Sequence, residues 1–447
     1  MGFSLQIHRC RTLTPPLPHP RRTLAAPLRF GDKFPFFRAV MSTSIPSTAL
    51  LFSLAFLMPA MGVAQQDTTL NLDLQMRVRS EWRDGYKVAT ATETPRDVVT
   101  VQRSRIGLRG KWKSFDYKLS AQDIRTFGGP AGQTQGTIGI SEAWWSSELV
   151  SGMVLKVGRQ EIKFDNERIV GAVDWSNPGR FLDGVRWDRR KDRPDQGNST
   201  AALTWDELNQ TSRYMLYHRA MVGQGNKLTF LVFAQRSETE PEATFFGFTT
   251  RFKLGSNGWF ATEAYFEPVQ DNPPFSAYPS LNIISGLEPM LIADLGINGE
   301  SGHQWQLGVD LVSPGFQPFL GTNHRHYGWM DQFYVGTQSA GLTDLRLRHT
   351  APLNFRLFDG EPSWGASFHH FRSSGFGNLL GNELDLWITG NNEGVLTWHI
   401  GFSALDATAR HIERQGDVPQ TLWNDAAGRI QHWGWVSLNF TPSFVLR

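Results

Sequence analysis

Hydrophobic and polar residues alternate along many short segments of this chain. In residues 70–79 every even position is apolar and every odd position is polar. Ten residues of strict alternation match a membrane-crossing strand, whereas strands in soluble sandwiches usually have about five or six residues. The alternation recurs in residues 305–311, 344–348, 353–357 and 396–402. The pattern predicts an all-β protein made of long amphipathic strands.

The connections between these segments alternate in length. Long polar or Gly- and Pro-rich stretches occupy residues 83–97, 127–135 and 267–280, and short turns fall near residues 114–116 and 147–152. About 16 to 18 strands fit when alternation is the criterion. No apolar run after residue 64 approaches the roughly 20 residues of a spanning helix. We expect a transmembrane antiparallel β-barrel whose amino terminus and short turns are periplasmic.

Aromatic residues are frequent and often paired. The chain contains 16 Trp and 31 Phe. Trp144–Trp145, Trp259–Phe260 and the pair Trp433 and Trp435 stand where predicted strands meet turns. In an outer-membrane barrel such residues form girdles at the membrane interfaces, whereas in a soluble sandwich they would be core. The length of the first predicted strand favours girdles.

The first 64 residues have the composition of a processing segment. Residues 49–57 are an apolar core of signal-peptide length, and Gly62-Val63-Ala64 supplies the small residues that a signal peptidase recognises. We therefore expect residues 1–64 to be a leader and signal peptide, with Gln65 as the first mature residue. Residues 1–40 are rich in Pro and Arg and are either an extended leader or a mis-assigned start.

Removal of the leader changes the charge of the chain. The leader contains seven Lys and Arg and one Asp, which leaves 37 basic and 41 acidic residues in residues 65–447, a net charge of −4. The sequence pI of 8.6 therefore reflects the leader, and we expect no nucleic-acid partner. Cys10, the only cysteine, also lies in the leader. Residues 65–447 are predicted to form a single barrel domain in the bacterial outer membrane.

Basic residues are concentrated in the first part of the predicted barrel. Residues 76–193 contain 22 Lys and Arg against 15 Asp and Glu, while the rest of the predicted mature chain contains 15 against 26. Six of these cations alternate with apolar residues on the first two predicted strands: Arg77, Arg79, Arg103, Arg105, Arg109 and Lys111. If the apolar side faces lipid, they line the lumen, where Arg binds carboxylates in bidentate fashion. Alternatively, they only make the lumen hydrophilic, as in barrels generally.

A second group of charged residues surrounds a Gly-containing connection. It consists of Arg159, Arg168, Asp174, Arg180, Asp183 and Arg186. Interleaved cations and carboxylates predict a compact loop that folds into the lumen as a constriction, and a solvated surface loop is the alternative. Arg159 shares its strand parity with Leu155 and Val157, so it would face the lumen only if a bulge intervenes.

Six segments of the chain are distinctive as motifs. They are GRQ at residues 158–160, RIVG at 168–171, DW…GRFLDGVR at 174–186, HYGWMDQF at 326–333, GLTDL at 341–345 and GNELDL at 381–386. Together they resemble the alginate-export family of outer-membrane porins. The resemblance implies an 18-stranded barrel with an Arg-rich constriction, through which an alginate-like anionic polysaccharide leaves the periplasm. The expected partners are this polysaccharide or another anionic solute, outer-membrane lipid and periplasmic export components.

Other functions stay open. A general or uptake porin for small anions or sugars is the main alternative, and the basic first part favours an anion channel over a neutral-sugar porin. A barrel enzyme is disfavoured because the chain has no H-E-x-x-H, Walker A or G-x-G-x-x-G motif. No catalytic residue and no cofactor is predicted. His324, His326 and His369–His370 lack an evident third ligand, so no metal site is predicted.

Overall fold

The computed structural model describes residues 68–86, 96–127, 136–190, 197–223, 225–239, 242–268, 285–314, 316, 318, 320–322, 324–333, 341–358, 360–375, 377–407 and 430–446. The predicted leader and signal peptide, Cys10 and Gln65 lie outside this part of the chain. Most of the long connections predicted near residues 83–97, 127–135 and 267–280 lie outside it as well.

Antiparallel strands make up nearly all of the described structure. The first nine are β1 (Thr69–Asp84), β2 (Arg96–Trp112), β3 (Phe115–Phe127), β4 (Gly136–Val150), β5 (Met153–Gln160), β6 (Leu182–Arg190), β7 (Asn198–Asp206), β8 (Thr211–Val222) and β9 (Asn226–Ser237). The others are β10 (Ala243–Leu254), β11 (Gly258–Pro268), β12 (Leu287–Asn298), β13 (Gln304–Val312), β14 (Leu342–Pro352), β15 (Ser363–Arg372), β16 (Leu379–Asn392), β17 (Leu396–Ala407), β18 (Ile430–Phe440) and β19 (Ser443–Leu446). A short 3₁₀ turn, η4 (Glu300–Gly302), precedes β13. Within the described ranges, no helix has the length and hydropathy to span a membrane.

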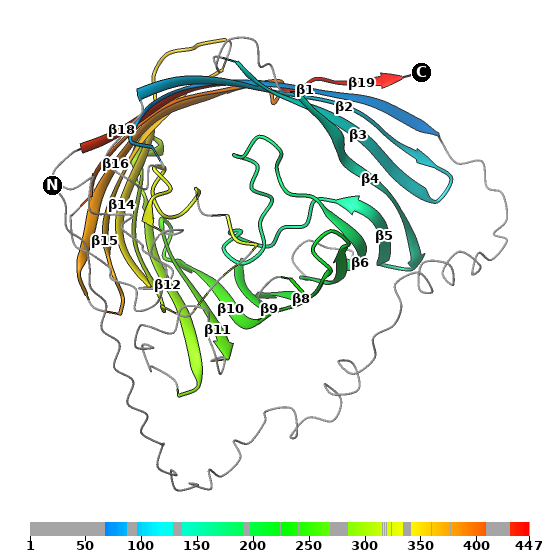
Figure 1. The fold of residues 1–447 in the computed structure, drawn as a ribbon, viewed down its shortest axis with the longest axis horizontal. Coiled ribbons are helices and arrows are strands. Elements are labelled where there is room, and N and C mark those ends of the chain that lie inside the picture. Colours follow the sequence, from blue (N-terminus) through cyan, green and yellow to red (C-terminus); the bar gives the residue numbers. More distant parts are fainter. Residues whose placement is uncertain are drawn as a thin grey trace, which may run out of the picture. The chain divides into compact units, whose positions relative to one another are not determined.

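The strands form one closed barrel (Figure 1). Each strand pairs with its sequence neighbours, and β1 pairs with β18 to close the sheet. β19 continues β18 beyond Thr441 and Pro442 and also pairs with β1. Proline has no N–H to donate to the ladder, but the Pro442 carbonyl still accepts a hydrogen bond from the Leu74 N–H at 3.0 Å. Because β18 and β19 follow one another along β1, they occupy one position in the sheet, and the barrel has 18 strand positions. The predicted transmembrane antiparallel β-barrel is confirmed.

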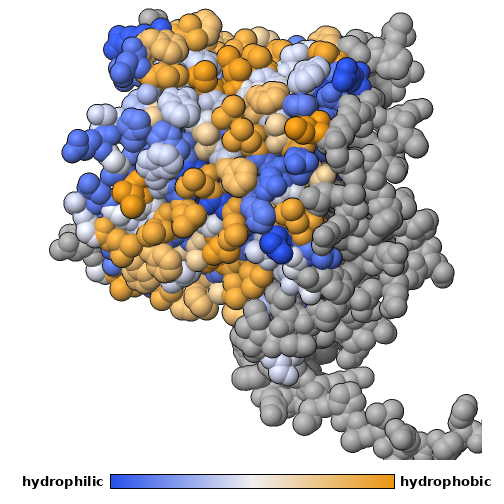
Figure 2. Space-filling model, turned by 90° about the vertical axis from the view of Figure 1, so that its left-hand side faces the viewer, coloured by the Kyte–Doolittle hydropathy of each residue, from blue (hydrophilic) through white to orange (hydrophobic). Residues whose placement is uncertain are grey.

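Side chains along each strand alternate between the lumen and the outer surface. On β8, Met215 and Tyr217 point inward and are 1% and 5% exposed, whereas Leu216 points outward and is 57% exposed. Figure 2 shows apolar side chains gathered over the outer face on one side of the barrel. Such a surface would be costly in water, and it matches the lipid-facing band of a membrane barrel.

Not every paired aromatic residue belongs to a girdle. Trp145 is exposed on the outer face, but Trp144 faces the lumen, where the Lys156 ammonium lies 3.8 Å from its ring centroid. Trp433 and Trp435 are almost completely buried inside the barrel. The girdle prediction is wrong for these two because both carry the inward parity of β18.

Residues 353–357 alternate in polarity but form a connection between β14 and β15. The Leu353 N–H donates to the Pro362 carbonyl at 2.8 Å, and Leu357 and Gly360 exchange two hydrogen bonds of 3.1 Å. The segment is therefore a tight turn, and its prediction as a strand is wrong. Five residues of alternation do not distinguish a strand from a turn that closes on itself.

Two long connections at one end of the barrel fold into its interior (Figure 1). The first lumen loop, residues 161–181, joins β5 to β6, and the second lumen loop, residues 313–341, joins β13 to β14. At the opposite end the connections are short, such as Lys113–Ser114 and Ser151–Gly152. The predicted alternation of long and short connections thus places both loops at the same end.

Candidate functional site: an arginine-lined lumen

The two lumen loops are joined to each other by backbone hydrogen bonds. Val170 and Leu320 form a parallel bridge, in which the Gly171 N–H donates to the Leu320 carbonyl at 2.8 Å. The Thr322 N–H donates to the Glu167 carbonyl at 2.9 Å. A Cβ on Gly171 would lie 2.1 Å from the Thr322 hydroxyl, so a larger residue there would push the loops apart. The loops therefore act as one unit inside the barrel.

Arg168 fixes this unit to the barrel. Its buried guanidinium pairs with Asp310 of β13 and with Glu263 of β11, the latter at 3.4 Å. It also donates to the Tyr327 hydroxyl at 3.2 Å. Burial would lower the pKa of Arg168, but these acidic partners outweigh burial and raise its pKa well above its ordinary value. Arg168 is thus a buried, fully paired link between the loops and the barrel. Neither its guanidinium nor the carboxylates would stay charged in this buried position without the other.

Four arginines of β1 and β2 hold the tip of the first lumen loop. Arg77 donates to the Asp174 and Ser176 carbonyls at 2.6 and 3.0 Å, and Arg79 donates to the Trp175 carbonyl at 2.6 Å. The other two contacts are Arg103 Nη2 to Asp174 Oδ1 at 2.9 Å and Arg105 Nη2 to the Pro178 carbonyl at 3.1 Å. These side chains enter the lumen as their strand parity predicts, and their donors are largely occupied by the loop.

The Asp174 carboxyl balances part of this positive charge. Burial would raise its pKa, but the guanidiniums of Arg103 and Arg77 outweigh burial and lower it below the ordinary value. Asp174 is therefore ionised at neutral pH. The loop tip presents both a carboxylate and a row of carbonyls to β1 and β2, which explains how four cations can converge on one segment.

Four of the remaining predicted cations lie along the lumen or within the loops. Arg109 pairs with Asp73 at 3.1 Å, and both are partly exposed. Arg186 pairs with Asp188 at 2.9 Å. Arg180 donates to the carbonyls of Gly171, at 3.0 Å, and of Leu320, so it strengthens the junction between the loops. Lys111 is exposed near the short-turn end of β2.

Arg159 and Asp183 do not belong to the lumen. They are register partners on β5 and β6, and they form a bidentate ion pair of 2.8 and 2.5 Å. No register shift separates Arg159 from Met153 along β5, so it shares the outward parity of that residue, which is 38% exposed. The bulge that a lumenal position required is absent from this described segment, and the prediction of these two residues as pore residues is wrong.

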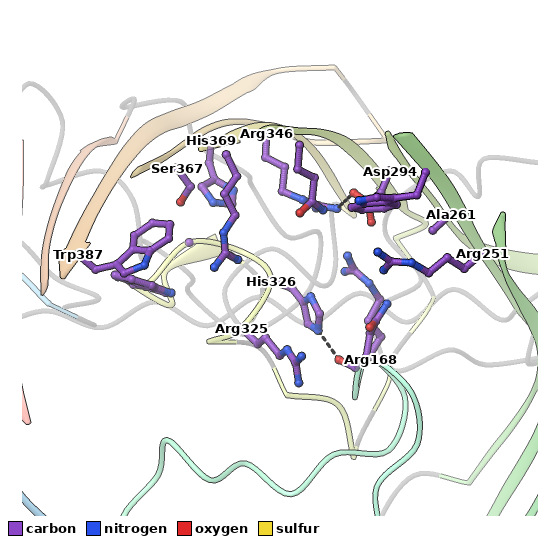
Figure 3. A pocket seen from close by; sticks show the side chains of 16 residues that line it. Arg168, Arg251, Ala261, Asp294, Arg325, His326, Arg346, Ser367, His369 and Trp387 are labelled. Carbon is purple, nitrogen blue, oxygen red and sulfur yellow. Dashed lines mark hydrogen bonds and ion pairs between the residues drawn. The ribbon is translucent and has the colours of Figure 1, made fainter. Parts of the chain in front are cut away.

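The opposite side of the lumen contains a cavity of about 200 Å³ that sequence analysis missed (Figure 3). Arg251 of β10 and Arg348 of β14 line it, together with Arg325 of the second lumen loop. The Arg251 guanidinium lies 3.9 Å from the ring centroid of Trp259, and that of Arg348 lies 4.8 Å from the ring centroid of Trp387. Among the residues that the structure describes, no carboxylate forms an ion pair with Arg251 or Arg348.

The other charged groups around this cavity are already paired. Arg346 contacts Asp294, Asp310 at 2.7 Å and Asp344 at 3.6 Å. Arg325 pairs with Glu167 at 3.1 Å, although its side chain is half exposed. The cavity therefore exposes Arg251 and Arg348 to a solute, and Arg325 in part.

His326 adds a neutral group to the same cavity. Burial, reinforced by the charge of Arg168, holds the pKa of His326 well below its ordinary value. Its Nε2–H donates to the Asn166 carbonyl at 2.7 Å. The imidazole of His326 is therefore uncharged at neutral pH and adds no positive charge to the cavity.

An aromatic cluster fills the lumen beside β16 to β18. Trp175, at the tip of the first lumen loop, stacks on His324 with the ring centroids 4.4 Å apart. Trp329 of the second lumen loop lies 4.9 Å from Trp387 and 4.8 Å from Trp435. This packing holds both loop tips against the barrel and restricts the path that remains.

Apart from His326, the histidines singled out in the sequence have side-chain partners. His324 Nδ1 lies 3.1 Å from Asp331, and His369 Nδ1 lies 2.9 Å from Asp344. His370 Nδ1 lies 2.8 Å from the Asn382 amide oxygen. No group of three or more His, Cys, Asp or Glu within the described ranges is arranged to hold a metal ion.

No protein-family model matches this chain, and no curated protein sequence matches it. The predicted resemblance to the alginate-export family is therefore unsupported. Solved structures do match. The outer-membrane protein OprD from Pseudomonas aeruginosa superposes with a TM-score of 0.56 at 13% identity, over 84% of this chain and 94% of OprD. The likeness is one of fold.

Two further structures show the same degree of similarity. OccAB2 from Acinetobacter baumannii has a TM-score of 0.56 at 12% identity, over 84% of this chain and 98% of its own. Pseudomonas aeruginosa OpdK with vanillate has a TM-score of 0.55 at 8% identity, over 84% of this chain and 99% of its own. The 18-stranded barrel of this chain therefore has the architecture of these porins.

Proposed function

We propose that the protein is an outer-membrane channel through which small anionic solutes enter the periplasm. The observation that carries the proposal is the cavity with Arg251 and Arg348. Each guanidinium rests on an indole face, which orients its planar donors, and each lacks a carboxylate partner among the described residues. A solute carboxylate that enters the cavity would meet an oriented guanidinium in its wall, and the local positive field attracts anions.

The size of the cavity and the two lumen loops favour a small solute over a polymer. The loops are joined across the interior by backbone hydrogen bonds, and the cavity beside them measures about 200 Å³. A polyuronate chain is much larger than this cavity. Export of an alginate-like polysaccharide and its periplasmic partners are therefore not part of the proposal.

Vanillate is a suitable probe because it is a small aromatic carboxylate and occurs with OpdK, one of the similar structures. The test measures reversal potentials and vanillate block of the protein in planar bilayers. The variants are Arg251→Gln with Arg348→Gln, and Lys113→Gln as a control. Lys113 lies in the β2–β3 turn beside the outward-facing Trp112, so its replacement removes a charge outside the lumen.

We expect an anion-selective wild-type pore that vanillate blocks. The double variant should lose much of this selectivity, and its half-blocking concentration should rise about tenfold, because a hydrogen bond to a charged group contributes about 1.5–3 kcal/mol. The Lys113→Gln variant should behave like the wild type. A cation-selective wild type, or a double variant with unchanged block, would overturn the proposal. Passage of uronate oligomers in preference to vanillate would instead support export.

A further inference from the structure

A groove lies on the outer surface of the barrel over β5 to β9. It has a volume of about 340 Å³ and a predominantly apolar lining. The strand register places Arg189, Ser199, His218 and Phe230 directly opposite one another on consecutive strands, from β6 to β9. All four have outward parity, as the 49% exposure of Phe230 confirms. The groove therefore faces the membrane and not the lumen.

The shape of the groove follows from small residues on β7. Ser199 and Ala201 form its floor, and Trp187 of β6 and Leu216 of β8 are the register partners of Ala201 on either side. Two small side chains between larger ones leave a channel along the strand.

The groove is polar only at one end. Arg189 and Ser199 each stand one residue from the end of their strands, at the short-turn end of the barrel. Trp187 and Ala201 are the next register pair on the same face, toward the middle of the strands. Ser199 Oγ lies 2.8 Å from His218 Nδ1. The polar end is thus at the level where an interfacial headgroup meets the acyl region.

Arg189 is the unusual member of this surface. It is exposed, and no described residue forms an ion pair with it. A charged side chain on the lipid face is tolerated near the interface, where its long stem can lie along apolar surface and its head can reach lipid phosphate. The charge at the end of an apolar channel matches the shape of a phospholipid, whose anionic phosphate joins an acyl chain.

We propose that this groove binds an anionic glycerophospholipid from the leaflet at the short-turn end of the barrel. One acyl chain lies on Ser199 and Ala201. The phosphate accepts hydrogen bonds from the Arg189 guanidinium and from the hydroxyl or imidazole of the Ser199–His218 pair. This site is independent of the solute path, because the groove and the lumen lie on opposite faces of β5 to β9.

Native mass spectrometry of the detergent-purified protein tests the proposal. Phosphatidylglycerol and phosphatidylethanolamine with identical acyl chains are added in separate titrations. Arg189→Gln removes the headgroup charge, and Ala201→Phe fills the groove without changing charge. Lys113→Gln is the matched control, because it removes one cation at the same end of the barrel but away from the groove. Circular dichroism and heat-dependent gel mobility establish that each variant is folded.

Both lipids offer a phosphate to Arg189, but only phosphatidylglycerol has a net negative charge. The wild type should therefore bind phosphatidylglycerol about tenfold more tightly than phosphatidylethanolamine, a difference of about 1.4 kcal/mol. Arg189→Gln should abolish this preference, Ala201→Phe should weaken both lipids, and Lys113→Gln should change neither. Equal binding of both lipids by the wild type would overturn the proposal. So would an unchanged preference in Arg189→Gln, unchanged binding in Ala201→Phe, or a dimer that covers the groove.

Discussion

Arginines on two sides of the same lumen have different surroundings. On β1 and β2, Arg77 and Arg103 donate to the backbone and carboxylate of the first lumen loop. On β10 and β14, Arg251 and Arg348 rest on indole rings and lack an ion pair with any described residue. The first set stabilises the constriction, whereas the second set can bind a solute. An arginine-rich lumen is therefore not uniformly available to anions, because partners determine which charges a solute meets.

The largest expected effect comes from replacing Arg168, the buried link between the lumen loops and the barrel. Arg168→Leu would leave Asp310 and Glu263 buried without this cation, and the free energy of unfolding should fall by about 3–5 kcal/mol. Urea unfolding followed by gel mobility measures the change. Arg186→Leu is a suitable control, since its pair with Asp188 is less buried and should contribute much less. Equal losses in both variants would contradict the role assigned to Arg168.

A smaller effect is expected at the loop tip. Arg103→Ala removes the ion pair with Asp174 and hydrogen bonds to loop carbonyls, with a cost of about 1.5–3 kcal/mol. The loop tip should then move more, and single-channel recordings should show larger current fluctuations. Arg348→Gln should change selectivity without such fluctuations. If Arg348→Gln destabilises the loop as much as Arg103→Ala, the two sides of the lumen are not distinct.

The outward-facing pair of Arg159 and Asp183 provides a third arginine environment to compare with the two sides of the lumen. Arg159→Gln should lower the free energy of unfolding by only about 0.2–1 kcal/mol, because both partners are partly exposed and stand one residue from the ends of their strands, near the membrane interface. Since the pair lies outside the lumen, the reversal potential should not change. Planar-bilayer measurements on Arg159→Gln and Arg251→Gln under one salt gradient separate the two positions. A selectivity loss in Arg159→Gln comparable to that in Arg251→Gln would show that it faces the pore.

The smallest expected effect concerns pH. Burial and Arg168 lower the pKa of His326 well below 6.5, so protonation opposes the folded arrangement and is confined to pH values well below 6.5. Between pH 7.5 and pH 6.5 the imidazole should stay neutral. The selectivity of wild type and His326→Gln should therefore change with pH in parallel over this interval. A pH-dependent selectivity present only in the wild type would mean that His326 titrates there.

The strand architecture could be predicted from the sequence because one face of each strand contacts lipid. Alternation in residues 70–79 placed Arg77 and Arg79 in the lumen, where the structure has them reach the first lumen loop. Strand parity also indicated that Arg159 would point outward. The structure agrees with this parity and not with the prediction of Arg159 as a pore residue. Local pattern therefore determines which face a residue occupies.

The partners of each arginine could not be predicted in the same way. Arg77 and Asp174 are 97 positions apart in the chain, and Arg168 and Asp310 are 142 positions apart, so no local pattern links them. A signal for one member of the second set was present, since Arg348 alternates with leucines in a predicted strand. The regional net charge does not reveal this arginine, because the later part of the chain is acidic overall.

Closure of the barrel through β1, β18 and β19 has a consequence for folding kinetics. The side chains of Gln75 and Asn439 form a hydrogen bond of 3.1 Å although they are 364 positions apart in the sequence. Neighbouring strands can pair as local hairpins, whereas this seam joins the two ends of the sheet and depends on the slowest search. Until it forms, β1 and β18 are open edges with unpaired backbone groups, which invite pairing with other chains. The seam should therefore be the last part of the sheet to gain protection from hydrogen exchange.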